Sequence, residues 1–489
     1  MTLPWRHPRR RYFAAAVAVG MLIGLVLAIR ILSPSDIVSR DQSRTVSYTI
    51  DIVANGNFIL AADADGFPAT KPPLVNYLSA PLVKLFGPAV WSFMLPSLTA
   101  FLALLVLIFF IARDAFAHLP SHPASFGLTQ SEWAALLAVG FYGLSPMALR
   151  LAFVARPDMI LVLFLTLGFY AANRALALPL AKSGGWAAVF WLAACLAAWA
   201  KGPIAVIPVG YGFLAAQLFR GDWRLSDRLY PAIGIPLSLA AGLAWPVAVY
   251  AIDPDHLRHV LLGEELGGQF EGPWYSGIVS AWEVPFFVVS RFMPWSLLLI
   301  PAALAFPWRQ WRRHPLGPSL LYLALLTIPF IVVVSRRGDR FAPYFPLVAV
   351  LCAWAAVYAW RGEALLRGSL AALPLAAAGL AIYFLWFSDQ AKDLSGPYLL
   401  DFVRQARTIT AGHPVVACKI DNRSLALQAL LGINQHGRYP EQAPAGGTWA
   451  ISYRPPPGSR TRLQSAPLPA AGGQRLQLSW VEGGNRLCR

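Results

Sequence analysis

Five short polar stretches of this sequence place charged side chains directly beside long apolar runs. They are Arg40–Arg44, Thr70–Pro73, Ala155–Asp158, Lys201–Pro203 and Ser335–Tyr344. A charge at membrane depth costs at least ~2.5 kcal/mol, so such residues are candidates for binding or catalysis. Lysine and arginine suit phosphate oxygens, and a carboxylate can take a proton from an attacking group. Together the stretches predict a site for a phosphate-bearing lipid substrate.

Two aspartates are the candidate catalytic residues. Asp41 lies in the first stretch with Arg44 as its supporting cation, and Asp158 lies in the third with Arg156. The carboxylate of Asp41 could act as a general base, steer an attacking hydroxyl or amine, or hold a metal. The plainer interpretations are an ordinary Asp–Arg pair in a polar loop and a local pair between Arg156 and Asp158.

The candidate phosphate-binding residues are three kinds of side chain. Two prolines follow Lys71 and fix the backbone there, whereas Lys201 stands alone between two apolar runs. The basic loop before Tyr344 contributes Arg337 and Arg340, whose forked guanidinium groups match phosphate oxygens. Each assignment has a plainer alternative. Lys71 could be a lysine that snorkels to the headgroups, the loop could be basic without binding phosphate, and Tyr344 could belong to the interfacial aromatic belt.

The elements that carry these residues are expected to be apolar helices. The composition is 57% hydrophobic and 13% charged, whereas a soluble domain carries about 25% charged residues. Apolar blocks of about 20 residues recur, which is the length that crosses a bilayer. We therefore predict an all-α polytopic membrane protein with about 11–13 transmembrane helices. The candidate spans are 12–32, 91–112, 133–152, 158–178, 185–200, 203–219, 229–251, 285–305, 318–335, 342–360 and 368–387.

Positive charges predict how the chain is oriented. The formal charge of +16 would suit a nucleic-acid partner, but most arginines lie in short loops between apolar blocks. The basic N-terminus precedes a retained signal anchor and is expected in the cytoplasm. Loops 33–90 and 252–284 and the chain from 388 onward then fall outside, together with all five polar stretches. Segment 72–88 is expected to be interfacial or re-entrant, or an extra crossing.

Residues 389–489 are expected to form a small extracytoplasmic α/β domain after a transmembrane domain over 1–388. Residues 399–409 and 422–433 have helical patterns, and 414–420, 448–453 and 475–481 have strand patterns. The domain contains no catalytic motif. Its Cys418 and Cys488 could form a disulfide if this part of the chain lies outside the cytoplasm. Cys195 and Cys352 fall inside apolar blocks and are expected to pack there.

The order of these motifs resembles the C-type glycosyltransferases of the protein O-mannosyltransferase and lipid A aminoarabinose transferase group. The resemblance covers roughly 35–360 of the sequence. The matching motifs are Asp41-Gln42-Ser43-Arg44, Lys71-Pro72-Pro73, Asp158, Lys201-Gly202, Pro273-Trp274-Tyr275, Arg291-Phe292-Met293-Pro294-Trp295 and Pro343-Tyr344. It implies a transferase in a bacterial inner membrane that moves a sugar from undecaprenyl phosphate to a lipid A-like lipid, a glycan or a protein.

The resemblance also implies roles for single residues. Asp41 and Asp158 would line the catalytic cavity, and Lys71, Lys201 and Tyr344 would hold the donor phosphate. In the same pattern, the arginine at position 44 would brace the first carboxylate.

This chain departs from the family pattern at three places. Gln42 stands where the family has glutamate, and Thr70 stands where the aminoarabinose transferases have glutamate. The loop that supplies a metal-binding histidine and a phosphate-binding arginine corresponds here to Glu264–Phe270, which contains neither. The basic loop, with Arg337 and Arg340, is a hypothetical replacement for that arginine.

No cofactor is predicted from these residues. A zinc site needs its ligands, and the family-type ligands are absent, so no metal site is expected. A divalent cation held by other side chains is the alternative, with candidate ligands His256, His259, Glu264 and Glu265.

Two other kinds of activity compete with glycosyl transfer. A transporter or flippase for a lipid-linked sugar should contain internal repeats with paired broken helices, and the sequence has no such repeat. Another extracytoplasmic lipid-substrate transferase, of the phosphoethanolamine kind, would need a large soluble domain rich in aspartate and histidine. An inactive structural relative is a further alternative, since Gln42 and Thr70 remove acidic groups. The sequence contains no nucleotide-binding motif, which a lipid-linked donor does not need.

Overall fold

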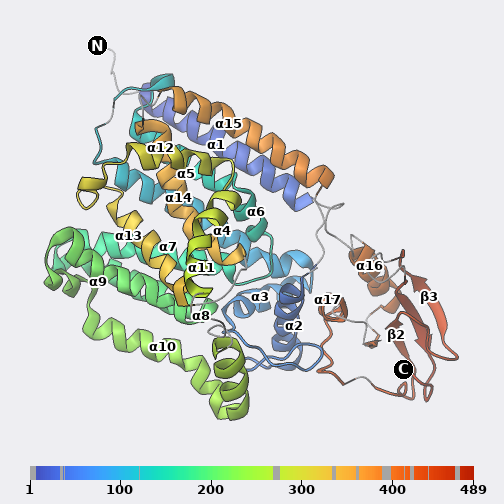
Figure 1. The fold of residues 1–489 in the computed structure, drawn as a ribbon. Coiled ribbons are helices and arrows are strands. Elements are labelled where there is room, and N and C mark those ends of the chain that lie inside the picture. The colour runs from blue at the N-terminus through green and yellow to red at the C-terminus, as the bar shows by residue number, and fades with distance from the viewer. Residues whose placement is uncertain are drawn as a thin grey trace. The chain divides into compact units, whose positions relative to one another are not determined.

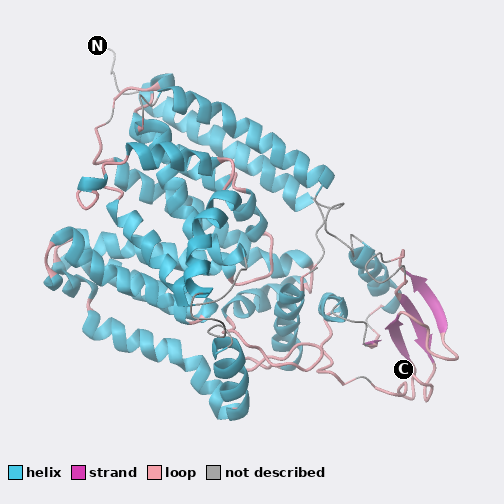
Figure 2. Cartoon of the chain, viewed as in Figure 1, coloured by secondary structure: helices cyan, strands magenta, loops and turns pink. Residues whose placement is uncertain are grey.

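A computed structural model describes residues 7–32, 37, 39–120, 122–267, 276–332, 338–359, 363–387, 398–411, 413–418, 423–438, 440–467 and 474–488. The chain divides into two compact units. The first comprises Met1–Ala28, Ser97–Phe153 and Pro157–Ala381, and the second comprises Ile29–Pro96, Val154–Arg156 and Ile382–Arg489. The strands of the described chain all lie near the C-terminus (Figure 1, Figure 2).

Long apolar helices build the first unit. They are α1 (His7–Leu32), most of α4 (Val90–Phe116), α5 (Gln130–Gly143), α6 (Pro146–Ala152), α7 (Asp158–Ala177), α8 (Leu180–Lys201), α9 (Val206–Arg220), α10 (Pro231–Ile252), α11 (Ser276–Arg291), α12 (Leu299–Ala305), α13 (Gly317–Val332), α14 (Phe345–Tyr358) and α15 (Glu363–Ile382). Single turns and irregular helices join them, among them η2 (Pro203–Ala205), η4 (His256–Leu266), η6 (Trp295–Leu298) and η8 (Gly338–Tyr344).

The predicted spans all coincide with helices, which lie wholly or mostly in this unit. In the described part of the chain, 8 helices are long and apolar enough to cross a membrane, or up to 10 if each bent pair is one span. The bent pairs are α5 with α6, at 61°, and α11 with the helix that starts at Trp295, at 116°. The remaining predicted span is α13, a shorter apolar helix. The chain is thus a polytopic membrane protein whose apolar part is all-α, as the sequence predicted.

Proline causes the break in each bent pair. Pro146 is the first residue of α6 and Pro294 precedes η6. Proline has no backbone N–H to donate and clashes with the preceding turn, so a helix cannot run through it without a kink. These breaks change the direction of the chain at the ends of α5 and α11.

Burial separates inner helices from outer ones in the first unit. In the most apolar 18-residue stretch of the span that contains α14, 94% of the residues are buried. In the corresponding stretches of α1 and α10, only 17% of the residues are buried. The alanines of α14, such as Ala349, Ala353 and Ala356, are fully buried, because small side chains let neighbouring helices approach closely. The exposed apolar faces of α1 and α10 are those expected to meet lipid.

The second unit combines the first long loop with the C-terminal segment. Its helices are α2 (Arg40–Asn55), α3 (Leu74–Phe86), α16 (Tyr398–Thr410) and α17 (Arg423–Leu431). Val46 and Ile50 of α2 share one buried apolar cluster with Leu427 and Leu430 of α17. The α3 helix has 13 residues and is therefore about 20 Å long, too short to cross a hydrocarbon core of ~30 Å.

A four-stranded sheet forms the C-terminal end of the second unit. Its strands are β1 (Val415–Ala417), β2 (Thr448–Ser452), β3 (Arg460–Gln464) and β4 (Gln477–Val481), in the order β1-β2-β4-β3. The β1 strand pairs parallel to β2, and the other pairs are antiparallel. The predicted helices and strands of this segment are present as α16, α17, β1, β2 and β4. The β3 strand was not predicted.

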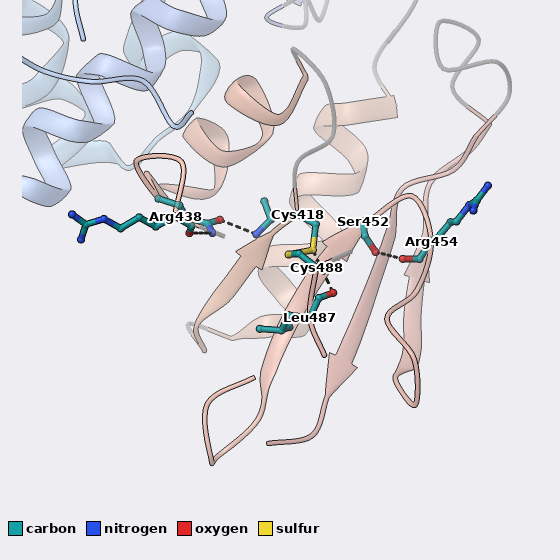
Figure 3. The surroundings of a disulfide bond; sticks show 8 residues. Cys418, Arg438, Ser452, Arg454, Leu487 and Cys488 are labelled. Carbon is teal, nitrogen blue, oxygen red and sulfur yellow. Dashed lines mark hydrogen bonds between the residues drawn. A yellow bond between two sulfur atoms is a disulfide. The ribbon is translucent and has the colours of Figure 1, made fainter. Parts of the chain in front are cut away.

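A disulfide joins Cys418, directly after β1, to Cys488 near the C-terminus (Figure 3). The two Cα atoms are 5.4 Å apart, and 70 positions of sequence separate the two cysteines. A cross-link over so long a loop restricts the unfolded chain and typically stabilises the fold by ~2–4 kcal/mol. The thiols of Cys195 and Cys352 are free.

Candidate active site

The first candidate carboxylate lies at the beginning of α2. Ser39 caps this helix by accepting a hydrogen bond from the backbone N–H of Gln42, over 3.3 Å. Asp41 therefore lies in the first turn, where the helix dipole favours a negative charge. Its Oδ2 atom is 3.6 Å from Nη2 of Arg156, and the Asp41 side chain is 33% exposed. The carboxylate is thus paired with a cation and still reachable from outside.

Gln42 binds the same segment that supplies Arg156. Its Oε1 atom accepts a hydrogen bond from the backbone N–H of Ala155, over 3.3 Å. Two successive residues of α2 therefore contact Val154–Arg156, which belongs to the same compact unit. In the family that the sequence resembles, this position is a glutamate. Gln42 keeps an acceptor oxygen, and that oxygen holds the backbone beside Arg156.

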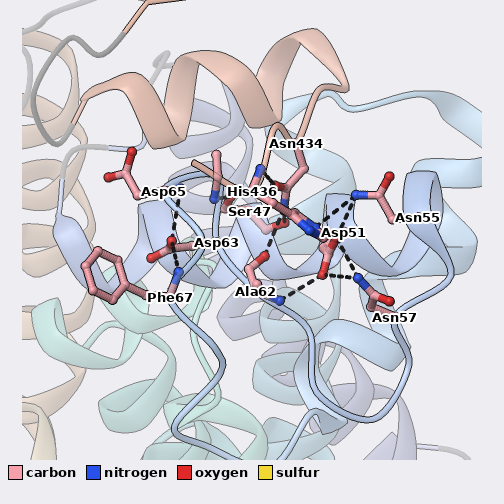
Figure 4. A network of polar contacts seen from close by, with 11 residues as sticks. Ser47, Asp51, Asn55, Asn57, Ala62, Asp63, Asp65, Phe67, Asn434 and His436 are labelled. Atoms are coloured by element: carbon pink, nitrogen blue, oxygen red, sulfur yellow. Dashed lines mark hydrogen bonds and ion pairs between the residues drawn. The ribbon is translucent and has the colours of Figure 1, made fainter. Parts of the chain in front are cut away.

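Arg44 forms an ion pair with an aspartate that the sequence analysis did not single out. Its Nε atom is 3.3 Å from Oδ2 of Asp63, whose side chain is 2% exposed. The other oxygen of Asp63 accepts hydrogen bonds from the backbone N–H groups of Asp65 and Phe67, over 3.1 and 3.0 Å (Figure 4). Burial raises the pKa of the Asp63 carboxyl, and the bond from Phe67 and the charge of Arg44 offset only part of that rise. That Arg44 braces Asp41, as the resemblance implies, stays a prediction.

Lys71 follows a small hairpin and precedes α3. The hairpin is closed by a bond from the backbone N–H of Ala69 to the carbonyl of Ala61, over 2.7 Å. On the other side, Asn76 of α3 donates to the carbonyl of Thr45 in α2, over 2.7 Å. The half-buried Lys71 is therefore held between two anchored elements of the second unit.

The second candidate carboxylate forms a close ion pair with the candidate lysine of the first unit. Nζ of Lys201 donates to Oδ1 of Asp158 over 2.5 Å, and the Asp158 side chain is only 3% exposed. Asp158 is the first residue of α7 and Lys201 is the last residue of α8. Each charge complements the dipole at its helix end. Lys201, which stands between two apolar runs of the sequence, thus has a carboxylate as a partner.

Tyr344 lies inside the first unit. Its hydroxyl donates to Oγ1 of Thr327 in α13 over 3.0 Å, and the residue is 5% exposed. Arg340 lies in the same turn, η8, and is partly buried. Arg337 and the Pro273-Trp274-Tyr275 motif lie outside the described residues. The roles of these residues toward a phosphate stay predictions.

The candidate metal ligands do not gather into a site where they are described. The part of the chain that the structure describes contains no group of three histidine, cysteine, aspartate or glutamate residues placed to hold a metal ion. His256, His259 and Glu264 all lie in η4, and the side chain of Glu265 is outside the described residues.

The structure therefore pairs candidate residues within each unit, in more than one place per unit. The second unit holds Asp41, Arg156, Arg44 and Asp63, with Lys71 beyond the hairpin. The first unit holds Asp158 with Lys201, and separately Arg340 and Tyr344 in η8. No pattern in the sequence marks Asp63, because a buried aspartate in a turn looks the same as an exposed one.

Solved structures share this arrangement of helices and sheet. ArnT from Cupriavidus metallidurans, bound to undecaprenyl phosphate, superposes with a TM-score of 0.68 over 94% of this chain and 97% of that chain, at 15% sequence identity. A second similar structure is the archaeal oligosaccharyltransferase AglB from Archaeoglobus fulgidus, in complex with an inhibitory peptide and a dolichol-phosphate. Its TM-score is 0.53 at 13% sequence identity, over 89% of this chain and 65% of that chain. This chain has the fold of the C-type glycosyltransferases.

Sequence similarity to this fold group is local. Undecaprenyl phosphate-alpha-4-amino-4-deoxy-L-arabinose arabinosyl transferase 1 from Pseudomonas fluorescens is 30% identical over 103 residues, which is 20% of this chain and 17% of that protein. No protein-family model matches the chain. The resemblance seen in the sequence motifs is thus confirmed at the level of the C-type glycosyltransferase fold.

Proposed function

We propose that this chain transfers a glycosyl group from a polyprenyl-phosphate-linked sugar to an acceptor outside the cytoplasm. The observation that carries the proposal is the pairing of each candidate aspartate with a cation, Asp41 with Arg156 and Asp158 with Lys201. The fold shared with a transferase bound to undecaprenyl phosphate supports it. The name of the relative from Pseudomonas fluorescens points to the same class of donor.

The two ion pairs include residues that are close neighbours in the sequence. Only Pro157 separates Arg156 from Asp158. Consecutive Cα atoms are 3.8 Å apart, so the Cα atoms of these two residues are at most ~7.5 Å apart in any conformation. This closeness along the chain is the reason why the proposal assigns both pairs to one reaction.

The two carboxylates are suited to different tasks. Asp41 is partly exposed, so an acceptor can approach it, whereas Asp158 is almost fully buried against Lys201. A general base must reach the proton it removes, and Asp41 meets that requirement better. In this proposal, Asp158 positions the ammonium group of Lys201, and Arg156 orients the carboxylate of Asp41.

The reaction exchanges one bond of the sugar for another. The acceptor oxygen or nitrogen gives its proton to Asp41 while it bonds to the anomeric carbon of the sugar. The bond from that carbon to the phosphate oxygen breaks, and polyprenyl phosphate leaves with the electron pair. Lys71, Lys201 and Arg340 stabilise the negative charge on the departing phosphate, together with Arg337. Tyr344 would join them by turning its hydroxyl away from Thr327.

The proposed location is a bacterial inner membrane, with the N-terminus in the cytoplasm and the C-terminal segment outside. The disulfide between Cys418 and Cys488 supports this orientation, because structural disulfides persist mainly in oxidising compartments. The basic loops at Arg220–Arg228 and Arg309–Arg313 support it as well, since short basic loops stay on the cytoplasmic side. The acceptor would be a lipid A-like lipid, a glycan or a protein of the cell envelope.

A complementation experiment tests the proposed activity. Envelope lipids, glycans and glycoproteins are compared by mass spectrometry between cells that contain or lack the gene. We expect a mass that corresponds to one added sugar to disappear on deletion and to return with the wild type. Asp41→Asn should restore at most ~1% of it, since a general base contributes about 100-fold or more. Asp401→Asn, at an exposed position of α16, is the matched control and should restore it fully.

Two outcomes would reject the proposal. One is an envelope that is unchanged by deletion of the gene. The other is full restoration by Asp41→Asn at wild-type protein levels in the membrane.

A further inference from the structure

A turn of the C-terminal segment forms hydrogen bonds with the hairpin that leads to Lys71. The turn is Asn434–Gly437, called here the clamp turn, and the hairpin with its extension is residues 61–71, called here the lysine loop. Nδ2 of Asn434 donates to the carbonyl of Ala62 over 2.9 Å, and the backbone N–H of Gly437 donates to the carbonyl of Ala64 over 2.7 Å. The same unit contains both segments. Figure 4 shows Asn434 and His436 beside Ala62 of the lysine loop.

Glycines on both sides permit this close approach. Gly66 has φ +90°, and a Cβ added to it would lie 3.0 Å from the carbonyl oxygen of His436. Gly437 has φ +69°, and a Cβ added there would lie 2.5 Å from the carbonyl oxygen of Asp65. Real Cβ atoms essentially never come as close as the contact at Gly437 and rarely as close as the one at Gly66, and positive φ is strained for other residues at both positions. The contact therefore needs glycine at each position.

A buried carboxylate fixes the other side of the clamp turn. Asp51 of α2 is fully buried and accepts hydrogen bonds from Nδ2 of Asn55 over 2.7 Å and from Nδ2 of Asn57 over 3.0 Å. It also accepts from the backbone N–H of Ala62 over 2.8 Å, and Nε2 of His436 contacts the same carboxylate. A buried charge needs such partners, so Asp51 joins α2, the lysine loop and the clamp turn in one network.

The network leaves the lysine loop few alternative positions. The α2 helix also holds it through Oγ of Ser47, which accepts from the N–H of Ala64 over 2.8 Å. The hydroxyl of Tyr48 donates to the carbonyl of Pro68 over 3.4 Å. Lys71 lies two residues after Ala69, whose hydrogen bond to Ala61 closes the hairpin. The two prolines that follow Lys71 fix the backbone up to α3. A shift of the hairpin must therefore shift Lys71.

We infer that the clamp turn is a positioning element for Lys71, and that it sets how tightly the protein holds the phosphate of its lipid donor. This inference rests on the proposed function for the identity of the ligand. It assigns a purpose to Asp51 and His436, which take no part in the proposed chemistry. Asn434, His436 and Gly437 act through Lys71 and do not contact the reacting atoms in this inference.

Gly437→Ala in the full-length protein tests the inference, with Gly446→Ala as the matched control. Within the described part of the chain, no heavy atom lies within 4 Å of a Cβ added at Gly446, and its φ is not in the strained range. The first measurement is hydrogen exchange at the amides of Asp63, Gly66 and Ala69, which close the hairpin. The second is binding of undecaprenyl phosphate to the purified protein in nanodiscs, with no sugar and no acceptor.

We expect Gly437→Ala to speed exchange at these amides and to weaken lipid-phosphate binding about tenfold, the equivalent of one or two lost hydrogen bonds. Gly446→Ala should match the wild type in both measurements. Unchanged exchange in Gly437→Ala would refute the clamp, and faster exchange with unchanged affinity would refute its effect on Lys71. A wild type that does not bind undecaprenyl phosphate would refute the proposed function, while the exchange measurement still decides whether the clamp exists.

His436→Asn is the second variant, for use if Gly437→Ala does not fold. His436 has φ +51°, a conformation that asparagine tolerates well, so this change removes the imidazole contact with Asp51 and keeps the backbone. It should raise the exchange rates and lower the affinity in the same direction, by a smaller factor. His436→Asn with wild-type exchange and affinity would overturn the inference.

Discussion

Nη2 of Arg156 lies 3.6 Å from Oδ2 of Asp41, which joins the chain just before α7 to the first turn of α2. The neighbouring Gln42 reinforces this junction through the backbone of Ala155. In the sequence, a local pair with Asp158, only two positions away, was the plainer interpretation of Arg156. The ion pair with Asp41 makes Arg156 a candidate for orienting the proposed general base.

Arg156→Gln should reduce sugar transfer much more than it reduces stability. The pair is partly exposed, so its loss should cost at most ~1 kcal/mol of folding free energy. Without the cation, Asp41 loses its orientation, and we expect the turnover rate to fall about 10- to 100-fold. Initial rates in proteoliposomes and thermal unfolding of the same preparation measure the two effects. A rate within twofold of the wild type would remove Arg156 from the site.

Lys201→Met should destabilise the protein, and Asp158→Asn should rescue stability but not activity. Removal of the lysine leaves Asp158, at 3% exposure, as a buried charge without this partner. Breaking a buried pair costs ~3–5 kcal/mol, and the quarter-exposed Lys201 favours the lower end of that range.

The double variant decides between a structural and a functional pair. We expect Lys201→Met with Asp158→Asn to unfold near the wild-type temperature, since neither charge is then left buried. The double variant should still bind undecaprenyl phosphate weakly, because the ammonium group is absent. Wild-type affinity in the folded double variant would show that the pair serves only stability.

The helices could be predicted from the sequence because the bilayer imposes a length and an apolar composition on each span. Every predicted span coincides with a helix, and even the short segment 72–88 contains α3. The bends at Pro146 and Pro294 were missed, since a proline inside an apolar block signals a kink without its angle. The β3 strand was missed as well, because Arg460–Gln464 is a polar, exposed edge strand without an apolar alternation.

The partners of the charged residues could not be predicted, although the residues themselves could. Asp41 and Arg156 are far apart in the sequence, and so are Asp51 and His436. A single sequence shows which residue types are costly in an apolar setting, but it contains no record of which pairs meet. In the sequence, Asp51 looks like an ordinary helix residue and Asp63 like an ordinary loop residue; their burial appears only in the structure. The clamp turn could therefore be found only from the structure.

Gln42→Glu should preserve the junction beside Arg156, whereas Gln42→Leu should weaken it. A carboxylate can accept the hydrogen bond from the N–H of Ala155 as the amide oxygen does. Leucine cannot accept it, and the loss of such a bond costs ~1 kcal/mol and frees the segment that holds Arg156. We expect Gln42→Leu to lower the transfer rate several-fold at little cost in unfolding temperature. Equal rates for both variants would show that this hydrogen bond has no role in catalysis.

Asp63→Asn should make the second unit more stable at neutral pH, in spite of the ion pair that it removes. Burial raises the pKa of the Asp63 carboxyl above its ordinary value of 3.8, so the folded state favours the protonated form. Between that ordinary value and the raised one, the folded state binds more protons than the unfolded state. The contribution of this carboxyl to the free energy of unfolding therefore falls as the pH rises through this window, with a limiting slope of ~1.4 kcal/mol per pH unit.

Thermal unfolding of wild type and Asp63→Asn between about pH 4 and pH 7 measures this difference. Asparagine keeps an oxygen for the N–H groups of Asp65 and Phe67 but cannot ionise, so the variant should lack the slope. The two proteins should match most closely at the acidic end, with the variant more stable above it. Asp401→Asn, on the exposed side of α16, should follow the wild type at every pH. A wild type that gains stability as the pH rises, relative to Asp63→Asn, would mean that the ion pair with Arg44 outweighs the cost of burial.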